Sequence, residues 1–458
     1  MRMTVAEVSR RCKGAIHIAD VDAVMTSVVT DSRDAVPGSL FVAIVGENVD
    51  GHEFARQAVE RGAVAVLSNR TIEEPCVVVD DPVLALGRLA ASARAGMDAT
   101  VVAITGSSGK TSTKDLIAAV LAAAGSTVSP VGSFNTEVGL PLTILGAAQG
   151  TEFLVLEMGM RGLGHIAYLA DIAVPDIAVV TNVGSAHIEL LGSREAIAKA
   201  KGELIQSLSV DGTAVLNGDD ELVRAMAAQT SAQVVLVGEA ADCQVRAVDV
   251  TVDTGARASF ELVDTASGTS APVRLNVAGR HQVANALAAA AVGLAVGLPV
   301  QVVAQRLSGA QPVSKWRMEV VTTASGITVI NDAYNANPES MRAALEALVT
   351  MPGRTWAVLG EMRELGTQSA AAHEDMGRLV ASLGVSRLVC VGEATGPMYR
   401  GALAAGLRPE ESDLVSDLAT AQALLDAQVK PGDVVLVKAS RSVGLERLAL
   451  TLMEGGQA

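Results

Sequence analysis

The sequence contains few aromatic residues and few basic residues for its length. Phe, Trp and Tyr make up 2% of the 458 residues, too few for the aromatic platforms on which single-stranded nucleic acids stack. The 35 Lys and Arg residues are outnumbered by 50 Asp and Glu residues, which gives a formal charge of -15. A surface this acidic repels phosphate backbones unless basic residues cluster, and the sequence has no such cluster. We therefore expect no nucleic-acid partner.

Paired cysteines and long apolar segments are also lacking. The cysteines are scattered without a C-x-x-C pair, which argues against a disulfide framework and against a structural zinc site. The N-terminal segment M-R-M-T-V-A-E-V-S-R-R-C-K-G-A lacks the apolar core of a secretory signal. The alanine-rich stretch 286–300 is interrupted by Gly293, Gly297 and Pro299 and is shorter than the roughly 20 residues that a membrane-spanning helix needs. We expect a cytoplasmic protein without stable membrane insertion, and a monomer.

Short β-branched runs alternate with alanine- and leucine-rich helical patterns along almost the whole chain. This alternation is typical of parallel sheets covered by helices, so the predicted fold class is α/β. The segment 245–277 differs because its short strands follow one another directly, which predicts an antiparallel extension of the central sheet. The predicted strands include residues 40–45, 64–67, 101–105, 153–157, 177–181, 357–359, 388–391 and 434–437.

Two lapses in this pattern predict three domains. The first falls before residue 98, and the second falls at residues 309–315, where Gly, Gln and Pro interrupt the periodicity. We place a smaller N-terminal α/β domain at residues 1–97, a central domain with a P-loop-type, mostly parallel sheet at 98–312, and a Rossmann-like α/β domain at 313–458.

The segment V-V-A-I-T-G-S-S-G-K-T-S, residues 101–112, is the strongest local signal. Gly106 and Gly109 allow backbone amides to converge on phosphate oxygens, because an apolar strand ends there and a helix begins. Lys110 can reach the outer phosphates and Thr111 can ligate magnesium, so the segment predicts a nucleoside triphosphate loop. The residues expected at the nucleotide are Thr105, Gly106, Ser107, Ser108, Gly109, Lys110, Thr111 and Ser112.

Three further polar residues follow or flank predicted strands, and their context leaves alternatives open. Glu157 ends a buried strand at the edge where ligands of parallel sheets gather, and its carboxylate suits magnesium. His187 follows another strand, either as a functional residue or as a hydrogen-bonded loop histidine. Lys201, like its neighbour Lys199, lies on an amphipathic helical pattern, and composition alone makes both of them solvated surface residues.

Residues 331–340 combine the end of a strand, a polar loop and a helix that begins beyond Pro338. Donors and acceptors crowd into this loop, namely Asp332, Tyr334, Asn335 and Asn337. Such a loop is either a capped turn or a clamp for a ligand, and the residues alone do not decide between the two.

Eight motifs in this chain stand in an order that resembles the Mur ligase family of peptidoglycan amino-acid and dipeptide ligases. The motifs are T-G-S-S-G-K-T, S-F-N-T-E-V-G-L-P-L-T, E-M-G, T-N-V-G-S-A-H, A-K-G-E, G-R-H-Q-V-A-N, W-R-M-E and D-A-Y-N-A-N-P-E-S. The resemblance covers essentially the whole length. It implies amide formation driven by ATP, through an acyl phosphate, and it accounts for Ile104, since the family loop begins T-G-x-x-G-K.

Within the family, residues 335–340 and 359–366 are most similar to members that join D-alanyl-D-alanine to UDP-N-acetylmuramoyl-tripeptide, the last cytoplasmic peptide step of peptidoglycan precursor synthesis. Diaminopimelate- or lysine-adding members share the D-S-R and D-G-H elements at 31–33 and 50–52, but their D-N-P-R motif is missing. A folylpolyglutamate synthetase-like ligase and a non-catalytic nucleotide-binding scaffold are the remaining alternatives.

The resemblance also implies roles for single residues. Thr111 and Glu157 would hold one magnesium ion, and His187 would help hold or orient a second together with Lys201, which is carbamylated by carbon dioxide in this family. Lys110 and Arg317 would face the transferred phosphate, so the implied catalytic residues are Lys110, His187, Lys201 and Arg317.

Binding roles follow from the same resemblance. Asn285 would face the adenine and Asp332 the ribose, with Tyr334 and Asn335 beside the nucleotide. The implied substrate contacts are Ser32, Arg33 and Asn48 at the uridine end, together with Asn135, Thr136 and Asn337. The family commonly has H-N where this chain has His281-Gln282, so the role of position 282 is open.

Overall fold

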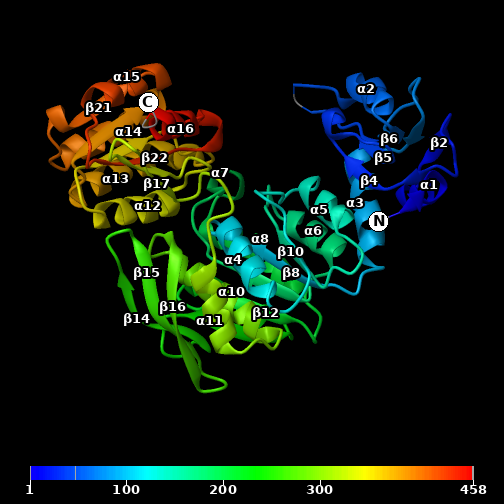
Figure 1. The fold of residues 1–458 in the computed structure, drawn as a ribbon, viewed down its shortest axis with the longest axis horizontal. Coiled ribbons are helices and arrows are strands. Elements are labelled where there is room, and N and C mark those ends of the chain that lie inside the picture. Colours follow the sequence, from blue (N-terminus) through cyan, green and yellow to red (C-terminus); the bar gives the residue numbers. More distant parts are fainter. Residues whose placement is uncertain (1, 47, 456–458) are drawn as a thin grey trace.

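The computed structural model describes residues 2–46 and 48–455, and among these residues the strands form three larger sheets and one small pair (Figure 1). The small pair joins β1 (Met3–Thr4) to β3 (Val24–Met25) in antiparallel fashion. Each larger sheet occupies its own stretch of the chain, and helices cover it. The α/β class predicted from the sequence is confirmed.

The N-terminal sheet has the strand order β2-β7-β6-β5-β4, with β2 antiparallel to its neighbour. Residues on β5 alternate between two cores: Leu40 and Val42 pack toward α1 and α3, whereas Phe41 packs toward α2. The strands are β2 (Ala15–His17), β4 (Ser27–Val29), β5 (Ser39–Val42), β6 (Ala63–Ser68) and β7 (Cys76–Val78), and the helices are α1 (Val5–Cys12), α2 (Ala55–Glu60) and α3 (Pro82–Arg94), with short 3-10 turns at Ser32–Asp34 and Gly51–Phe54.

The central sheet has the order β16-β15-β14-β13-β12-β11-β8-β10-β9, parallel from β9 to β14 and antiparallel beyond it. This confirms the predicted antiparallel extension. The strands are β8 (Thr100–Thr105), β9 (Thr127–Val128), β10 (Phe153–Glu157), β11 (Ile177–Val180), β12 (Thr213–Asn217), β13 (Gln233–Gly238), β14 (Val245–Val252), β15 (Arg257–Asp264) and β16 (Thr269–Ala278).

Helices cover both faces of the central sheet because its parallel strands are apolar on both sides. On β8, Val101 and Ala103 pack toward α5, α6 and α8, whereas Val102 and Ile104 pack toward α4, α10 and α11. The helices are α4 (Lys110–Leu121), α5 (Gly139–Gly146), α6 (His165–Ala173), α7 (Ile188–Leu191), α8 (Arg194–Gln206), α9 (Glu221–Arg224), α10 (Gln282–Ala295) and α11 (Val300–Gly309), and a 3-10 segment covers Ala225–Gln229.

The C-terminal sheet has the order β17-β18-β22-β19-β20-β21, parallel except for β17. The strands are β17 (Glu319–Thr322), β18 (Thr328–Asn331), β19 (Thr355–Leu359), β20 (Arg387–Val391), β21 (Ser412–Val415) and β22 (Val434–Lys438). The helices are α12 (Pro338–Thr350), α13 (Ser369–Ser382), α14 (Gly396–Ala404), α15 (Leu418–Gln428) and α16 (Glu446–Glu454), with 3-10 turns at Gly366–Gln368, Glu393–Thr395, Pro409–Glu411 and Arg441–Val443.

The N-terminal and C-terminal sheets lie on opposite sides of the molecule, and the central sheet joins them from below (Figure 1). Helix α3 packs against α5 and α6, which attaches the N-terminal sheet to the central one. The carboxyl ends of β8 and β18 both face the region between the central and C-terminal sheets, since Ser107 after β8 and Asn337 after β18 are hydrogen-bonded to each other. In the described part of the chain, no helix has both the length and the apolarity that crossing a membrane requires.

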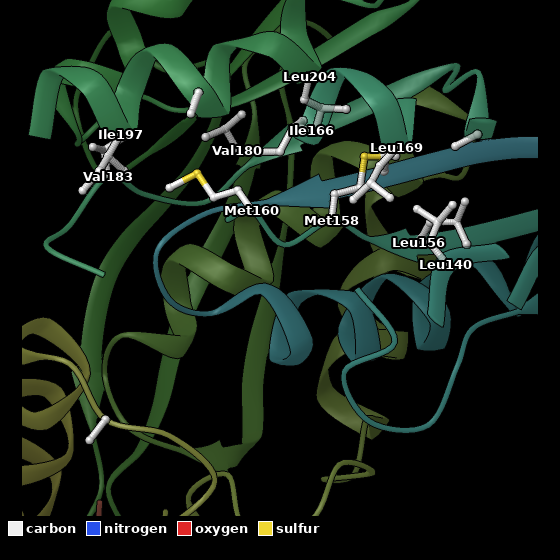
Figure 2. Close-up of a cluster of buried hydrophobic side chains, with 14 of the residues drawn as sticks. Leu140, Leu156, Met158, Met160, Ile166, Leu169, Val180, Val183, Ile197 and Leu204 are labelled. Atoms are coloured by element: carbon white, nitrogen blue, oxygen red, sulfur yellow. The ribbon is translucent and has the colours of Figure 1, made fainter. Parts of the chain in front are cut away.

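Helix α8 carries a buried lysine, which composition alone did not predict. Ile197, Lys201 and Leu204 are four and three residues apart, so they share one face of the helix. Ile197 and Leu204 belong to the apolar core that also contains Val183, Met160 and Ile166 (Figure 2). Lys201 is therefore 1% exposed, and the interpretation of it as a surface residue is wrong. The neighbouring Lys199, which lies off this face, is exposed as predicted.

Candidate active site

The loop between β8 and α4 has a backbone that glycine alone fits at two points. Gly106 has φ 154° and Gly109 has φ 78°. A Cβ atom on Gly106 would lie 1.8 Å from Thr181 Oγ1, and one on Gly109 would lie 2.5 Å from Asn285 Oδ1. Any side chain at either position would therefore clash with a neighbour as well as strain the backbone. The glycines predicted to shape this loop are required here for both reasons.

Asn182 fixes the first half of this loop from the neighbouring strand end. Its backbone carbonyl accepts from Ser107 N at 3.0 Å and its Oδ1 accepts from Ser108 N at 3.0 Å. The Nδ2 of Asn182 donates to Ser108 O at 3.2 Å, and Thr181 Oγ1 donates to the same carbonyl at 2.7 Å. Because the amides of Ser107 and Ser108 are already used, the amides from Gly109 onward are the ones left for phosphate oxygens.

This arrangement predicts that Asn182→Ala weakens nucleotide binding. The variant leaves Ser108 N without its acceptor, a loss of about 1.5 kcal/mol that corresponds to roughly a tenfold rise in the KM for ATP. Steady-state kinetics measures this rise. Asn276→Ala is the matched control. Asn276 lies on the distant strand β16, and its Nδ2 donates to Ser308 O at 2.7 Å. An unchanged KM for ATP in Asn182→Ala would show that the loop keeps its shape without this side chain.

Lys110 begins helix α4 and its Nζ donates to Gly106 O at 2.8 Å. Burial lowers the pKa of its ammonium, while the nearby carboxylates of Glu157 and Glu364 act in the opposite direction. Arg317 adds further positive charge near the same point. The site therefore presents a poorly solvated cation that an incoming polyanion would stabilise.

Hydroxyl and carboxylate oxygens gather beside Lys110. Thr111 Oγ1 donates to Glu157 Oε2 at 2.8 Å and lies 3.0 Å from Ser133 Oγ. Asn135 Nδ2 donates to Glu157 Oε1 at 2.8 Å, and Arg317 Nη2 donates to Ser133 Oγ at 2.8 Å. Glu157 is 1% exposed, so its carboxylate is held by these donors rather than by water.

This donor set fits magnesium. In residues 2–46 and 48–455, no cluster of three or more His, Cys, Asp and Glu side chains is arranged to hold a metal ion. Magnesium is typically bound by one or two carboxylates together with phosphates and water, rather than by a closed protein cage. Thr111 and Glu157 supply the hard oxygen ligands for an ion of that kind.

The C-terminal sheet contributes a second polar group at the end of β18. Asp332 Oδ1 accepts from Met318 N at 2.9 Å, and its Oδ2 pairs with Lys438 Nζ at 2.5 Å. The Arg317 guanidinium stacks over the ring of Tyr334, 4.1 Å from its centroid. Lys438 also donates to Asn335 O at 2.9 Å, so this buried lysine fixes the loop that follows the strand.

Asn337 turns out to cap a helix and also to join the two sheets. Its Oδ1 accepts from Ser340 N at 2.8 Å at the start of α12, which is the capped turn considered from the sequence. Its Nδ2 donates to Ser107 O at 3.3 Å across the interface. Both side-chain groups are thus engaged within the protein.

At the start of α10, the side chain at position 282 is hydrogen-bonded to Asn285. Gln282 Oε1 accepts from Asn285 Nδ2 at 2.8 Å, while Asn285 Oδ1 accepts from Thr113 Oγ1 at 3.1 Å. Gln282 therefore orients Asn285 against the nucleotide loop. His281 lies beside them, and burial lowers its pKa to about 4, so it is neutral at physiological pH.

A cavity of about 500 Å³ lies between the central and C-terminal sheets, bounded by these groups. Residues that the sequence pointed to and that line it are Ser107, Ser108, Gly109, Lys110, Thr111, Ser112, Asn135, Glu157, Asn285, Arg317, Asp332, Tyr334, Asn335 and Asn337. Residues that line it and that were given no role from the sequence include Ser133, Asn182 and Glu339, and Lys438 lines it as well.

Other candidate residues lie outside the lining of this cavity. Thr105 ends β8 and Gly106 begins the loop that follows it. Thr136 Oγ1 accepts from Gly139 N at 3.4 Å at the start of α5. His187 Nδ1 pairs with Glu364 Oε2 at 2.6 Å, a contact that lowers the pKa of Glu364. Lys201 is buried on α8.

The residues predicted to contact uridine all lie in the N-terminal sheet region. Ser32 is buried and its Oγ donates to Gln57 Oε1 at 2.6 Å. Arg33 pairs with Asp31, and both this arginine and Asn48 are largely exposed.

Three family models match successive parts of the chain. Residues 24–94 match the model described as Mur ligase family, catalytic domain. Residues 104–293 match the Mur ligase middle domain, and residues 316–441 match the Mur ligase, glutamate ligase domain.

Named relatives and solved structures are similar over nearly the whole length. The chain is 45% identical to UDP-N-acetylmuramoyl-tripeptide–D-alanyl-D-alanine ligase of Mycobacterium leprae (strain TN), with 99% of each chain covered. A crystal structure of MurF from Acinetobacter baumannii superposes with a TM-score of 0.89 at 32% identity, covering 99% of each chain. MurF ligase from Thermotoga maritima in complex with ADP superposes with a TM-score of 0.82 at 32% identity, covering 94% of this chain and 98% of that one.

Proposed function

We propose that this chain, which belongs to the Mur ligase family, joins D-alanyl-D-alanine to UDP-N-acetylmuramoyl-tripeptide with ATP as the energy source. The observation that carries the proposal is the cavity, where the loop at Lys110 faces Arg317 and Asp332 from the other sheet. Relatives with the corresponding name cover the full chain, and one similar structure was solved with ADP. The cytoplasmic location and the monomeric state expected from the sequence stay predictions.

The chemistry begins with two anions. The terminal carboxylate of the tripeptide attacks the γ-phosphorus of ATP, the bond to the β,γ-bridging oxygen breaks, and ADP leaves with that electron pair. The amine of D-alanyl-D-alanine then attacks the resulting acyl phosphate, loses a proton, and expels inorganic phosphate. No protein nucleophile takes part in either step.

Positive charge around the cavity suits the first step. Lys110 and Arg317 both line the site, so they would offset the repulsion between carboxylate and triphosphate and stabilise the transferring phosphoryl group. Thr111 and Glu157 would hold one magnesium ion, and His187 with carbamylated Lys201 would hold or orient another. Bound there, magnesium supplies charge neutralisation and orientation of the phosphate oxygens.

The surroundings of Lys201 favour its carbamylation. Burial and the nearby positive charge of Lys110 hold the pKa of Lys201 well below its usual value. The uncharged amine is the form that reacts with carbon dioxide. Met160 Sδ, at 4.0 Å, is the one hydrogen-bond partner found for Nζ among the described residues, so the amine is not tied up in an ion pair.

We also propose that residues 1–97, 98–312 and 313–458 act as three units with separate tasks. The first would hold the uridine end of the substrate through Ser32, Arg33 and Asn48. The second would hold the nucleotide and, through Asn135 and Thr136, the peptide end. The third would contribute Arg317, Asp332 and Asn337. The side chain of Asn337 already caps α12 and donates to Ser107 O. It would therefore contact the substrate only after its hydrogen bond to Ser107 breaks.

Phosphate release from ATP tests the proposed reaction. The expected result is release that requires both UDP-N-acetylmuramoyl-tripeptide and D-alanyl-D-alanine. Release only with UDP-N-acetylmuramoyl-dipeptide and diaminopimelate or lysine would place the chain one step earlier and overturn the proposal. No release with either pair would return the folate-type ligase and the non-catalytic scaffold to consideration.

A further inference from the structure

The loop that carries His187 is held by the C-terminal part of the chain at three points. Glu339 accepts from Ser185 N at 2.8 Å and from Ser185 Oγ at 3.1 Å. Glu364 Oε2 pairs with His187 Nδ1 at 2.6 Å, and the backbone carbonyl of Glu364 accepts from Glu189 N at 3.3 Å. All of these contacts join a loop that follows β11 to segments that follow β18 and β19.

The backbone at this meeting point is strained on both sides. His187 has φ 67° and Glu364 has φ 64°, a left-handed conformation that side chains other than glycine rarely adopt. Such residues persist where their surroundings hold them, and they concentrate at functional sites. Here the two strained residues are each other's partners.

The pairing determines which nitrogen of His187 remains available. An ionised carboxylate only accepts hydrogen bonds, so Nδ1 carries the proton that is shared with Glu364. When the ring is neutral, Nε2 then keeps its lone pair, and the neutral imidazole is the form of histidine that ligates a metal. Carboxylates that orient a histidine ligand in this way are a general feature of metal sites.

Stability alone does not account for this ion pair. The side chain of Glu364 is 54% exposed and that of His187 is 25% exposed. An exposed pair of this kind contributes little to holding two parts of a protein together. Its effect is therefore on the orientation of the imidazole rather than on the free energy of docking.

We propose that Glu364 is a positioning residue that sets the ring of His187 for a metal ion, while Glu339 holds the adjoining backbone at Ser185. The C-terminal part of the chain thereby completes a metal site on the central part only when the two are in contact. The inference rests on the proposed function, because it assigns His187 to the second metal ion of that reaction.

Manganese binding tests the inference without relying on turnover. The whole chain is titrated with Mn²⁺ in the presence of a non-hydrolysable ATP analogue, and free Mn²⁺ is followed by electron paramagnetic resonance. We expect two bound ions in the unmodified protein. Glu364→Ala should keep the tighter site and weaken the second at least about tenfold, in line with other changes to the partners of metal ligands.

Three further variants make the test specific. Glu364→Gln keeps an acceptor for Nδ1–H, so its second-site affinity should fall between those of the unmodified protein and Glu364→Ala. Glu339→Gln weakens the hold on Ser185 and should cause a smaller loss. Glu361→Gln removes the same charge from the same loop. Among the described residues, the side chain of Glu361 pairs only with Arg363 Nε, at 2.9 Å, so this variant should leave both sites unchanged.

Two results would overturn the inference: unchanged second-site affinity in a folded Glu364→Ala variant, or a single bound Mn²⁺ in the unmodified protein. If Glu364→Ala does not fold, as judged by circular dichroism, the Glu364→Gln and Glu339→Gln variants decide in its place. Failure of the proposed function can be distinguished from failure of this inference. A protein that binds two ions as described, but releases no phosphate with the tripeptide and D-alanyl-D-alanine, contradicts the reaction and not the metal site.

Discussion

Lys110→Met should lower kcat by at least about a hundredfold, which is the typical effect of removing one preorganised donor from a transition state. Lys110 Nζ lies at the start of α4 beside Glu157 and Arg317, where it can follow the phosphoryl group as charge develops. Methionine keeps the length of the side chain but neither the charge nor the donors. Phosphate release under saturating substrates measures the effect.

Lys114 provides the control for this variant, because it lies one turn later on the same helix. Its ammonium is 1% exposed, pairs with Asp115 and donates to Pro130 O at 2.5 Å, away from the cavity lining. Lys114→Met should therefore lower the melting temperature and leave the kcat of the folded enzyme close to normal. If Lys110→Met turns over as fast as Lys114→Met, the role assigned to Lys110 is wrong.

Lys201→Ala should lose most of the activity, by at least about a hundredfold, because it removes the group that would carry the carbamate beside a metal ion. The variant leaves a small space among Ile197, Leu204 and Met160. Short carboxylates or a high concentration of bicarbonate should enter this space and partly restore turnover, since they return an anionic oxygen to it.

Lys199→Ala is the matched control, two residues away on the same helix and exposed to solvent. It should show normal turnover and no response to added carboxylates. Normal turnover in Lys201→Ala would contradict the carbamate assignment. A loss of activity in Lys201→Ala without any rescue would indicate that the buried side chain of Lys201 acts through packing and not through a carbamate.

The fold was predictable from local patterns because each strand carries its own signal. The strand 153–157 was predicted with the bounds that the structure shows, and residues 245–277 form the antiparallel extension that their short strands indicated. These segments are apolar over whole strand lengths, and turns of Gly and Pro separate them. Helix α10 ends at Ala295, just before the Gly297 and Pro299 that interrupt the apolar stretch.

The nucleotide loop was predictable as well, but the side chains that fix it were not. Asn182 and Ser133 come from segments distant in sequence from the residues that they contact, so no local pattern identifies their partners. Glu339 and Glu364 were quoted within motifs, yet their contacts cross from one sheet region to another. Contacts of this kind depend on how the sheets are placed, which periodicity does not encode.

Lys201 shows where a closer physical argument from sequence would have succeeded. Its charge suggested the surface, but its spacing from Ile197 and Leu204 places it on the apolar face of the helix. A lysine on such a face is expensive to bury and calls for a functional explanation. Only the family resemblance singled it out at that stage, and the spacing provides an independent reason.

Transfer of isotope from the tripeptide tests the central claim most directly, namely that the carboxylate attacks ATP at this site. The tripeptide is prepared with ¹⁸O in its terminal carboxylate, and the inorganic phosphate released with D-alanyl-D-alanine is analysed by mass spectrometry. An acyl phosphate predicts that one ¹⁸O atom appears in phosphate for each amide bond formed. Phosphate without ¹⁸O, released together with the amide product, would contradict the account.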